Sequence, residues 1–301
     1  MKAIARIEQF LEAAVSTGEE RGCPPKLAGA IRHAVFPGGA RIRPQLCLAV
    51  ALACGNDDPR LSAAAAVSIE LLHCASLVHD DLPCFDDAAT RRGHPSVHKA
   101  FGENLAVLAG DALIVLAFQT LARAGGTSPT RLAPLIGTIA AGVGMPFGIV
   151  AGQAWESESR VSLTDYQRAK TGALFVAATT AGAQAAGADP AQWRALGEWL
   201  GEAYQVADDI RDVMADPQLL GKPVGQDVAL GRPSAAIDLG LAGAVAHFET
   251  LVSAAIDAVP DCASGDAMRQ LVRQESERLV PRAACDKFRL SPHLVAPGVT
   301  A

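Results

Sequence analysis

Aromatic residues make up only 5% of this 301-residue chain, and runs in which β-branched or aromatic residues alternate with polar ones are scarce. That scarcity argues against a large β-sheet. Alanine is abundant instead, and leucine, glutamate and arginine recur at helical spacing, which predicts helices almost everywhere. Loop signals separate apolar-periodic stretches of about 15 to 30 residues, which are longer than an average helix.

No internal repeat and no strong linker divides the chain. We therefore predict one all-α domain over residues 1–301, built as a bundle of long helices. The last residues, from about Leu290, contain two prolines and a glycine and are expected to form a loose tail.

The chain also lacks an excess of basic residues, since 26 lysines and arginines face 32 aspartates and glutamates. A nucleic-acid-binding protein would be expected to show a basic excess or patch, so we expect no nucleic-acid partner. The seven cysteines are an odd number and show no CxxC spacing. We interpret them as reduced, mostly buried thiols rather than as disulfides or a zinc site.

No signal peptide is recognisable, because the first twelve residues alternate charged and apolar side chains. The protein is accordingly predicted to be cytoplasmic. The most membrane-like stretch, residues 104–122, has Asp111 near its middle. A charged residue there costs about 2.5–3.5 kcal/mol on insertion. We predict a buried core helix at this position and no membrane span.

Two acidic clusters lie within apolar stretches. In the first, residues 68–93, an apolar helix reaches Asp80 and Asp81 before Pro83 ends it. Proline removes a backbone donor and disfavours helix in the residue before it. The chain is therefore expected to turn just after the first acidic pair, which allows Asp86 to swing back beside Asp80.

The second acidic cluster lies in residues 201–214, where four polar side chains are spaced at i, i+3, i+4 and i+7. This spacing predicts one face of one helix. Val206 and Ile210 occupy its other faces. The four residues are Gln205, Asp208, Asp209 and Asp212.

An acidic cluster is often a solvated helix face, and that interpretation applies to each cluster taken alone. Here apolar neighbours such as Leu77, Val78 and Ile210 interrupt the carboxylates. Burying a carboxylate in such surroundings is costly without a compensating cation. Two such clusters predict the opposite walls of a cavity that holds metal ions. Mg²⁺ is usually bound by one or two protein carboxylates together with water and the phosphate oxygens of a substrate, so the predicted metal indicates a phosphorylated substrate.

Basic residues beside turns and acidic clusters could hold the phosphates of such a substrate. Arginine grips phosphate bidentately, whereas lysine acts as a point charge. Any one of them alone is commonly a surface charge. The six candidates are Arg41, Arg43, Arg91, Arg92, Lys170 and Lys222.

From about residue 28 to 235 the chain resembles the trans-polyprenyl diphosphate synthases, most closely the geranylgeranyl diphosphate synthases of bacterial carotenoid pathways. Two paired aspartate motifs in this order are highly specific for that family. The resemblance rests on GGARIRP (Gly38–Pro44), HDDLPCFDD (His79–Asp87), RRG (Arg91–Gly93), VLAGDAL (Val107–Leu113), GQAWE (Gly152–Glu156), KTGALF (Lys170–Phe175), YQVADDIRD (Tyr204–Asp212) and GKPVGQD (Gly221–Asp227).

The resemblance implies the isoprenoid synthase fold, in which long helices surround a central cavity, and about three Mg²⁺ ions per active site. It also implies a homodimer. The implied metal ligands are Asp80, Asp81 and Asp86 in the first motif and Asp208, supported by Asp209 and Asp212, in the second.

The resemblance further implies two diphosphate sites. Arg91, Lys170 and Lys222 would hold the allylic diphosphate. Gly39, Arg43 and Arg92 would hold isopentenyl diphosphate. Thr171 and Gln205 would steady the cation and the reacting chain.

The chain departs from the family pattern at several positions. Alanine stands at position 40 where a lysine is usual, so one contact to isopentenyl diphosphate is missing. The other departures are Ala88, Ala89, His94, Glu156, Gln226 and Arg232.

The implied reaction is Mg²⁺-assisted ionisation of the allylic diphosphate, attack by isopentenyl diphosphate and loss of a proton. It needs no Ser, His or Cys nucleophile, so His73, His79 and His98 are expected to be structural.

The length of the product depends on the residue five before Asp80, which lies about 7–8 Å along the helix. The family's fifteen-carbon makers usually have an aromatic residue there. The small Ala75 and Ser76 instead favour a twenty-carbon product.

Other interpretations of the function remain open. A non-catalytic subunit that modulates a partner would be expected to lose one aspartate motif, and a terpene cyclase would lack the second. A purely structural bundle would leave the embedded carboxylates unexplained. A farnesyl diphosphate synthase remains the alternative within the family.

Overall fold

The computed structural model describes residues 2–126, 128–159, 162–214 and 234–281. The described chain is mostly helical, as the sequence predicted, and its one sheet is a two-stranded antiparallel ribbon, β1 (Thr90–Arg91) and β2 (His94–Pro95). The helices of the first half are α1 (Lys2–Gly18), α2 (Pro25–Val35), α3 (Ile42–Ala53), α4 (Pro59–Asp80), α5 (Val97–Phe101) and α6 (Glu103–Ala124).

The second half continues the bundle with both regular and irregular helices. They are α7 (Pro129–Val143), α8 (Ile149–Ala154), the 3₁₀ turn η1 (Trp155–Ser157), α9 (Leu163–Gln167), the π-helical segment η2 (Arg168–Gly172), α10 (Ala173–Ala185), the 3₁₀ turn η3 (Pro190–Trp193), α11 (Arg194–Met214), α14 (Ala235–Asp238), α15 (Gly240–Asp257) and α16 (Gly265–Leu279). The expected tail from residue 290 lies outside the described residues.

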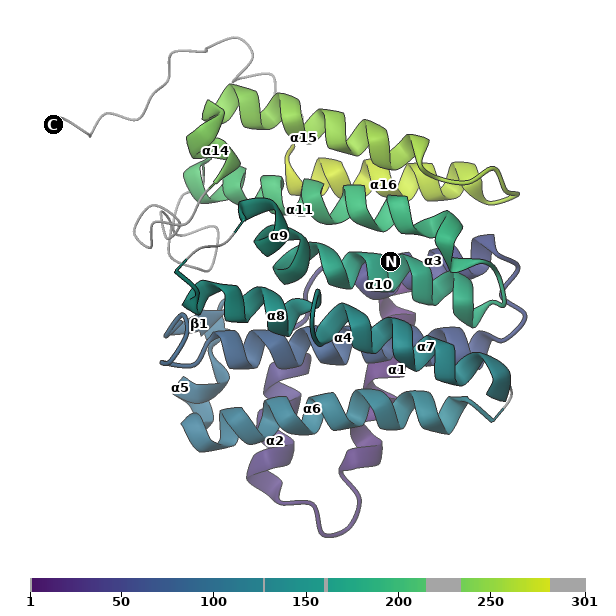
Figure 1. Ribbon diagram of the computed structural model, residues 1–301. Coiled ribbons are helices and arrows are strands. Elements are labelled where there is room, and N and C mark those ends of the chain that lie inside the picture. Colours follow the sequence, from purple (N-terminus) through teal and green to yellow (C-terminus); the bar gives the residue numbers. More distant parts are fainter. Residues whose placement is uncertain (1, 127, 160–161, 215–233, 282–301) are drawn as a thin grey trace, which may run out of the picture.

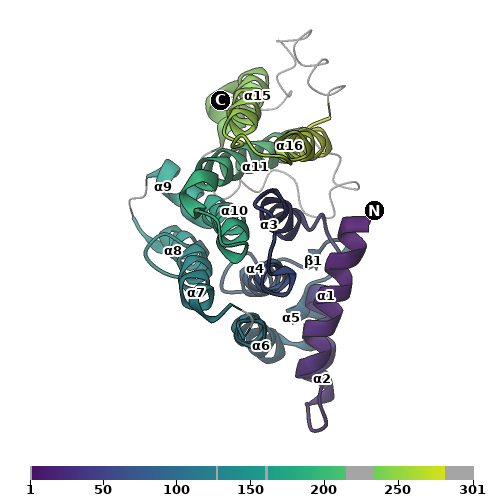
Figure 2. The same cartoon turned by 90° about the vertical axis from the view of Figure 1, so that its right-hand side faces the viewer.

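Helix α4 lies at the centre of the bundle. Viewed nearly end-on, it is surrounded by α3, α10 and α6, with α1 and α2 on the remaining side (Figure 2). Its N-terminus is well specified, because the Asp58 side chain accepts a hydrogen bond from the backbone N–H of Leu61 at 3.0 Å and Pro59 occupies the first turn. Most residues of α4 are buried, which explains why its sequence is apolar all round.

The carboxyl end of α4 is where the sequence predicted it. The helix ends at Asp80, and the chain then turns, so that the N–H of Asp86 donates to the carbonyl of Asp80 at 3.0 Å. The prediction that Asp86 returns beside Asp80 is confirmed. Pro83 accounts for the turn, because it cannot continue the helix.

Helix α6 is only partly the buried core helix that was expected. By length and composition α4 and α6 could each cross a membrane, but the most apolar window of α4 is 83% buried and that of α6 only 39%. One side of α6 packs along α4 (Figure 1). On its other side Leu108 and Val115 are more than half exposed, so this apolar face has no cover within the described chain.

The thiols also differ in part from expectation. Cys47 and Cys74 are buried, and burial raises the pKa of Cys47 to about 12 and that of Cys74 to about 11. Cys84 is exposed, however, and Cys54 is only partly buried. The described cysteines are all free, but most of them are not buried, and their reduced state stays a prediction.

Candidate active site

The segment η2 links the two acidic clusters. Its Lys170 places Nζ 3.6 Å from Asp80 Oδ1, at the end of α4. The next residue, Thr171, donates its hydroxyl proton to Gln205 Oε1 of α11 at 2.7 Å, and Gln205 Nε2 donates to Asp209 Oδ1 at 2.9 Å. Two adjacent residues of one short segment therefore contact both clusters, although the clusters lie more than 120 residues apart in sequence.

Close packing of glycines holds η2 in place. A Cβ atom on Gly152 of α8 would lie 2.3 Å from the backbone nitrogen of Lys170. A Cβ atom on Gly201 of α11 would lie 2.6 Å from the Cα atom of Gly172. Only glycine permits these approaches, because real Cβ contacts are not so short. Segments of π-helix are rare and often occur at functional sites.

The first acidic cluster contains a buried carboxylate oxygen that accepts no hydrogen bond within the described chain. Asp80 Oδ1 is buried and has no hydrogen-bond partner among the described residues. Burial raises the pKa of Asp80 to about 6, although Lys170 and Arg91 act in the opposite direction. The nearest cationic groups, on Lys170 and Arg91, stand 3.6 and 3.9 Å from its oxygens. A metal cation at this oxygen would satisfy it, so Asp80 fits the role of one ligand to a divalent ion.

Asp81 lies beside Asp80 in sequence but in a different environment. Its side chain is almost fully buried, and Arg91 grips both of its oxygens, with Nε at 2.9 and 3.2 Å. Arg91 therefore holds Asp81 as a bidentate ion pair. The pair borders a shallow pocket on the α2 side of α4, which is also lined by Arg92 and His33.

In the second cluster the three aspartates have different surroundings. Asp208 accepts a hydrogen bond from Arg211 Nη2 at 3.0 Å. Asp209 is buried, and besides Gln205 it accepts the backbone N–H of Ala235 at 2.8 Å, which fixes the start of α14. Asp212 is also buried.

Among the residues described, no group of three possible ligand side chains is gathered closely enough to hold a metal ion. The assignment of the six aspartates as ligands thus stays a prediction.

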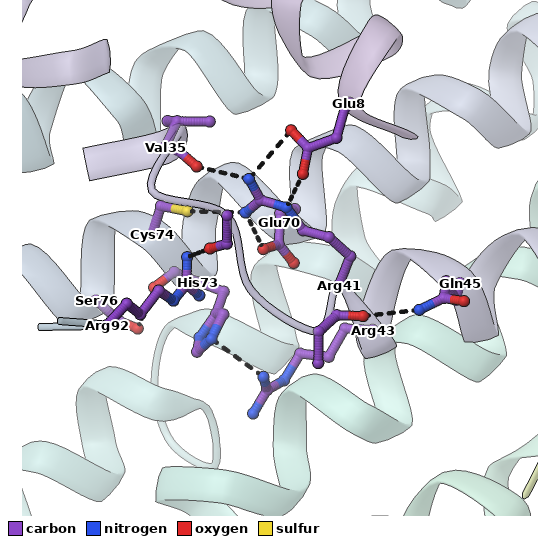
Figure 3. A network of polar contacts seen from close by, with 12 residues as sticks. Glu8, Val35, Arg41, Arg43, Gln45, Glu70, His73, Cys74, Ser76 and Arg92 are labelled. Atoms are coloured by element: carbon purple, nitrogen blue, oxygen red, sulfur yellow. Dashed lines mark hydrogen bonds and ion pairs between the residues drawn. The ribbon is translucent and has the colours of Figure 1, made fainter. Parts of the chain in front are cut away.

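The predicted isopentenyl diphosphate residues lie together. Arg92 Nη1 donates to the carbonyl of Gly38, and a Cβ atom on Gly39 would lie 2.9 Å from the Arg92 guanidinium carbon. Arg43 stands at the start of α3 with its guanidinium carbon 4.5 Å from the centre of the Phe175 ring. Its Nη1 is 3.2 Å from His73 Nε2 (Figure 3).

His73 lies beside these residues, and its expected structural role stays a prediction. Burial and then the positive charges of Arg43, Arg92, Arg91 and Arg41 hold its pKa well below the usual value. A lowered pKa favours the neutral imidazole, whose Nε2 can accept a hydrogen bond from Arg43 Nη1. The sequence spacing indicates that His73 lies on the same side of α4 as Asp80, because it precedes Asp80 by about two helical turns.

One predicted phosphate-binding cation has a different role. Arg41 was grouped with the other basic residues, but its side chain is fully enclosed and pairs with Glu8 and Glu70 (Figure 3). Burial alone would lower the pKa of Arg41, yet the two carboxylates raise it overall. Its partners come from distant helices, so its position beside Arg43 could not reveal them.

The remaining predicted residues are placed as follows. Lys170 also forms an ion pair with Glu156, which in turn accepts the hydroxyl proton of Tyr166 at 2.6 Å. Ala75 is 1% exposed within the main apolar core, and the Ser76 hydroxyl donates to the carbonyl of His73 at 2.8 Å. Lys222 lies outside the described residues.

Comparisons with known proteins agree with this fold and identify the family. The model of the polyprenyl synthetase family matches residues 24–266. A geranylgeranyl diphosphate synthase of Cereibacter sphaeroides is 53% identical over 276 residues, which cover 92% of this chain and 96% of that protein.

Solved structures are similar as well. A geranyltransferase from Legionella pneumophila gives a TM-score of 0.79 at 27% identity, covering 92% of this chain and 95% of that one. A geranyltransferase from Helicobacter pylori, complexed with magnesium and isoprenyl diphosphate, gives 0.72 at 30% identity, covering 93% and 97%. An all-helical bundle with two acidic clusters joined through one lysine-bearing segment defines the class. The chain belongs to the polyprenyl synthetase family.

The orphaned oxygen of Asp80 leads to a prediction for thermal unfolding. Mg²⁺ with inorganic pyrophosphate should raise the melting temperature by roughly 5 °C or more, because ligands that bind only the folded state stabilise it. Asp80→Asn should remove most of that increase. Asp57→Asn, which alters an exposed carboxylate paired with Arg131, serves as the control and should keep it. An increase that is equal in Asp80→Asn and wild type would contradict a metal site at Asp80.

Proposed function

We propose that this chain condenses isopentenyl diphosphate with an allylic diphosphate, farnesyl diphosphate as starter, and releases geranylgeranyl diphosphate and pyrophosphate. The observation that carries the proposal is the contact of η2 with both acidic clusters, through Lys170 to Asp80 and through Thr171 to Gln205. The Cereibacter relative is named for that product.

Mg²⁺ is the proposed cofactor, with about three ions per site. The buried oxygen of Asp80 and the returned Asp86 would hold ions on one side, and Asp208 would hold one on the other. When bound, the metal neutralises the diphosphate and so favours its departure. The Helicobacter structure, a complex with magnesium and isoprenyl diphosphate, supports this choice.

The cations of the site would then act on the diphosphate groups. Arg91 and Lys170 already lie beside Asp80, where they can bind the leaving diphosphate and stabilise its charge as the allylic C–O bond breaks. Pyrophosphate leaves with the bonding electron pair. The double bond of isopentenyl diphosphate, held by Arg43 and Arg92, attacks the allylic cation, and the pyrophosphate takes up the proton that is lost.

Thr171 and Gln205 would serve the cation rather than the phosphates. Their side chains are hydrogen-bonded to each other, so each presents a fixed dipole. Fixed dipoles stabilise developing charge without a reorganisation cost during the reaction.

A direct assay tests this function. Purified protein with isopentenyl and farnesyl diphosphates and Mg²⁺ should yield geranylgeranyl diphosphate, measured by mass spectrometry. Asp80→Ala and Asp208→Ala should each reduce turnover by about 1000-fold or more, since each removes a proposed metal ligand. Asp257→Ala, an exposed position on α15, should retain wild-type turnover. Near-normal rates in Asp80→Ala with Mg²⁺ present would exclude the mechanism, and an inactive wild-type chain would favour the non-catalytic subunit.

Product length follows from the position of Ala75, five residues before Asp80 on α4. Its small side chain lets a growing chain pass, whereas a larger one would block it. Ala75→Tyr should therefore shift the product from twenty carbons to fifteen, as measured by chromatography of the dephosphorylated products. Ala75→Ser provides the matched control and should keep the longer product. A fifteen-carbon product from the wild-type chain would instead identify a farnesyl diphosphate synthase.

A homodimer is the proposed assembly, with α6 at its interface. Val107, Leu108 and Val115 are 42%, 51% and 56% exposed on this helix. Asp111 is exposed between them, which suits a protein interface better than lipid. Met145 and Phe147, in the connection between α7 and α8, are also exposed.

Sedimentation should show twice the mass of the chain, and Leu108→Glu should produce monomers because it places a charge within the interface. Leu52→Glu alters an exposed leucine on α3 and should leave the dimer intact. A wild-type monomer at micromolar concentration would exclude this assembly. That the chain acts as one helical domain in the cytoplasm stays a prediction.

A further inference from the structure

Arg41 is the most completely enclosed cation near the site. Its side chain is 0% exposed. Nε donates to Glu8 of α1 at 2.8 Å, Nη1 donates to Glu70 of α4 at 2.6 Å, and Nη2 donates to the carbonyl of Val35 at the end of α2 at 2.6 Å (Figure 3). One guanidinium thus joins three helices and has a partner on every nitrogen.

The backbone of Arg41 has an energetically unfavourable conformation. Arg41 precedes α3 and has a φ of 49°, in the left-handed region. A residue with a Cβ atom costs about 1–2 kcal/mol in that conformation. Gly38 and Gly39 before it also have positive φ. The glycine loop, residues 38–41, therefore depends on contacts made by the Arg41 side chain to keep its shape.

The glycine loop and the residues just after it carry the isopentenyl half of the site. The carbonyl of Gly38 accepts the Arg92 guanidinium, and Gly39 packs directly against that group. Arg43 follows Arg41 by two residues and reaches His73. Because Ala40 supplies no cation, diphosphate binding on this side depends on Arg43 and Arg92, which both depend on the loop.

We propose that Arg41 is a positioning residue for the isopentenyl diphosphate site. Glu8 and Glu70 hold the guanidinium, and the guanidinium fixes the glycine loop so that Arg43 and Arg92 face one diphosphate. The allylic side has a separate support, because Lys170 and Arg91 are held by Glu156 and Asp81. This inference rests on the proposed function and adds a residue to it that contacts neither substrate.

The test compares the two substrates. Arg41→Lys keeps the charge but cannot reach Glu8, Glu70 and Val35 together, and it should raise KM for isopentenyl diphosphate by about tenfold. Glu8→Gln removes one charge at the edge of the network and should raise it by about threefold. KM for the allylic diphosphate and kcat should stay within about twofold. Calorimetric titration with isopentenyl diphosphate alone should show the same loss of affinity.

Arg32→Lys is the matched control. Arg32 also joins α2 to Glu12 and Glu19 near the end of α1, but it does not contact the glycine loop. It should lower thermal stability without changing either KM. Equal increases in both KM values, or an effect of Arg32→Lys equal to that of Arg41→Lys, would overturn the proposal. Should Arg41→Lys not fold, Glu8→Gln decides, and an unchanged affinity in that variant counts against it.

The titration also separates this proposal from the proposed function. A wild-type chain that binds isopentenyl diphosphate without turnover would refute the function, and the loss of binding in the variants would still support the role of Arg41. A wild-type chain with turnover and variants with unchanged binding would refute the role of Arg41 alone.

Discussion

The site depends on the placement of Asp80, a carboxylate that is buried at the end of the central helix without a hydrogen bond to one of its oxygens. Burying a charge is costly unless opposite charges or a metal compensate for it. Lys170 and Arg91 approach this carboxylate but do not satisfy its buried oxygen. The arrangement of α4, η2 and the β1–β2 ribbon can be understood as the support that keeps these charges near one another.

The same principle extends to the partners of each cation. Arg91 pairs with Asp81, and Lys170 pairs with Glu156. On α11, which carries the second acidic cluster, Arg211 pairs with Asp208. Each of these three cations therefore has an acidic partner within the described chain. In the proposed function, diphosphate and metal ions would replace these internal pairs and would also compensate the buried oxygen of Asp80.

Local patterns in the sequence predicted the elements that local chemistry specifies. Pro83 and the paired aspartates predicted the end of α4 and the return of Asp86, and the spacing of Gln205 and Asp209 predicted a shared helix face. Long-range packing was not predictable in this way. Arg41 and Arg43 look equivalent in sequence, yet one pairs with Glu8 and the other meets His73. The exposed face of α6 has the composition of a core helix, so composition alone could not distinguish this exposed apolar face from a buried one.

The π-helical segment shows why sequence alone could not complete the site. Its formation depends on Gly152 and Gly201 approaching from two other helices, and no local propensity specifies such a segment. Glycine is required at both positions for a steric reason that is independent of catalysis, since a Cβ atom at either position would displace η2. Displacing η2 would nevertheless separate Lys170 from Asp80 and Thr171 from Gln205 together. Packing and chemistry are therefore inseparable at these positions, and the glycines of the bundle determine the geometry that the charged residues use.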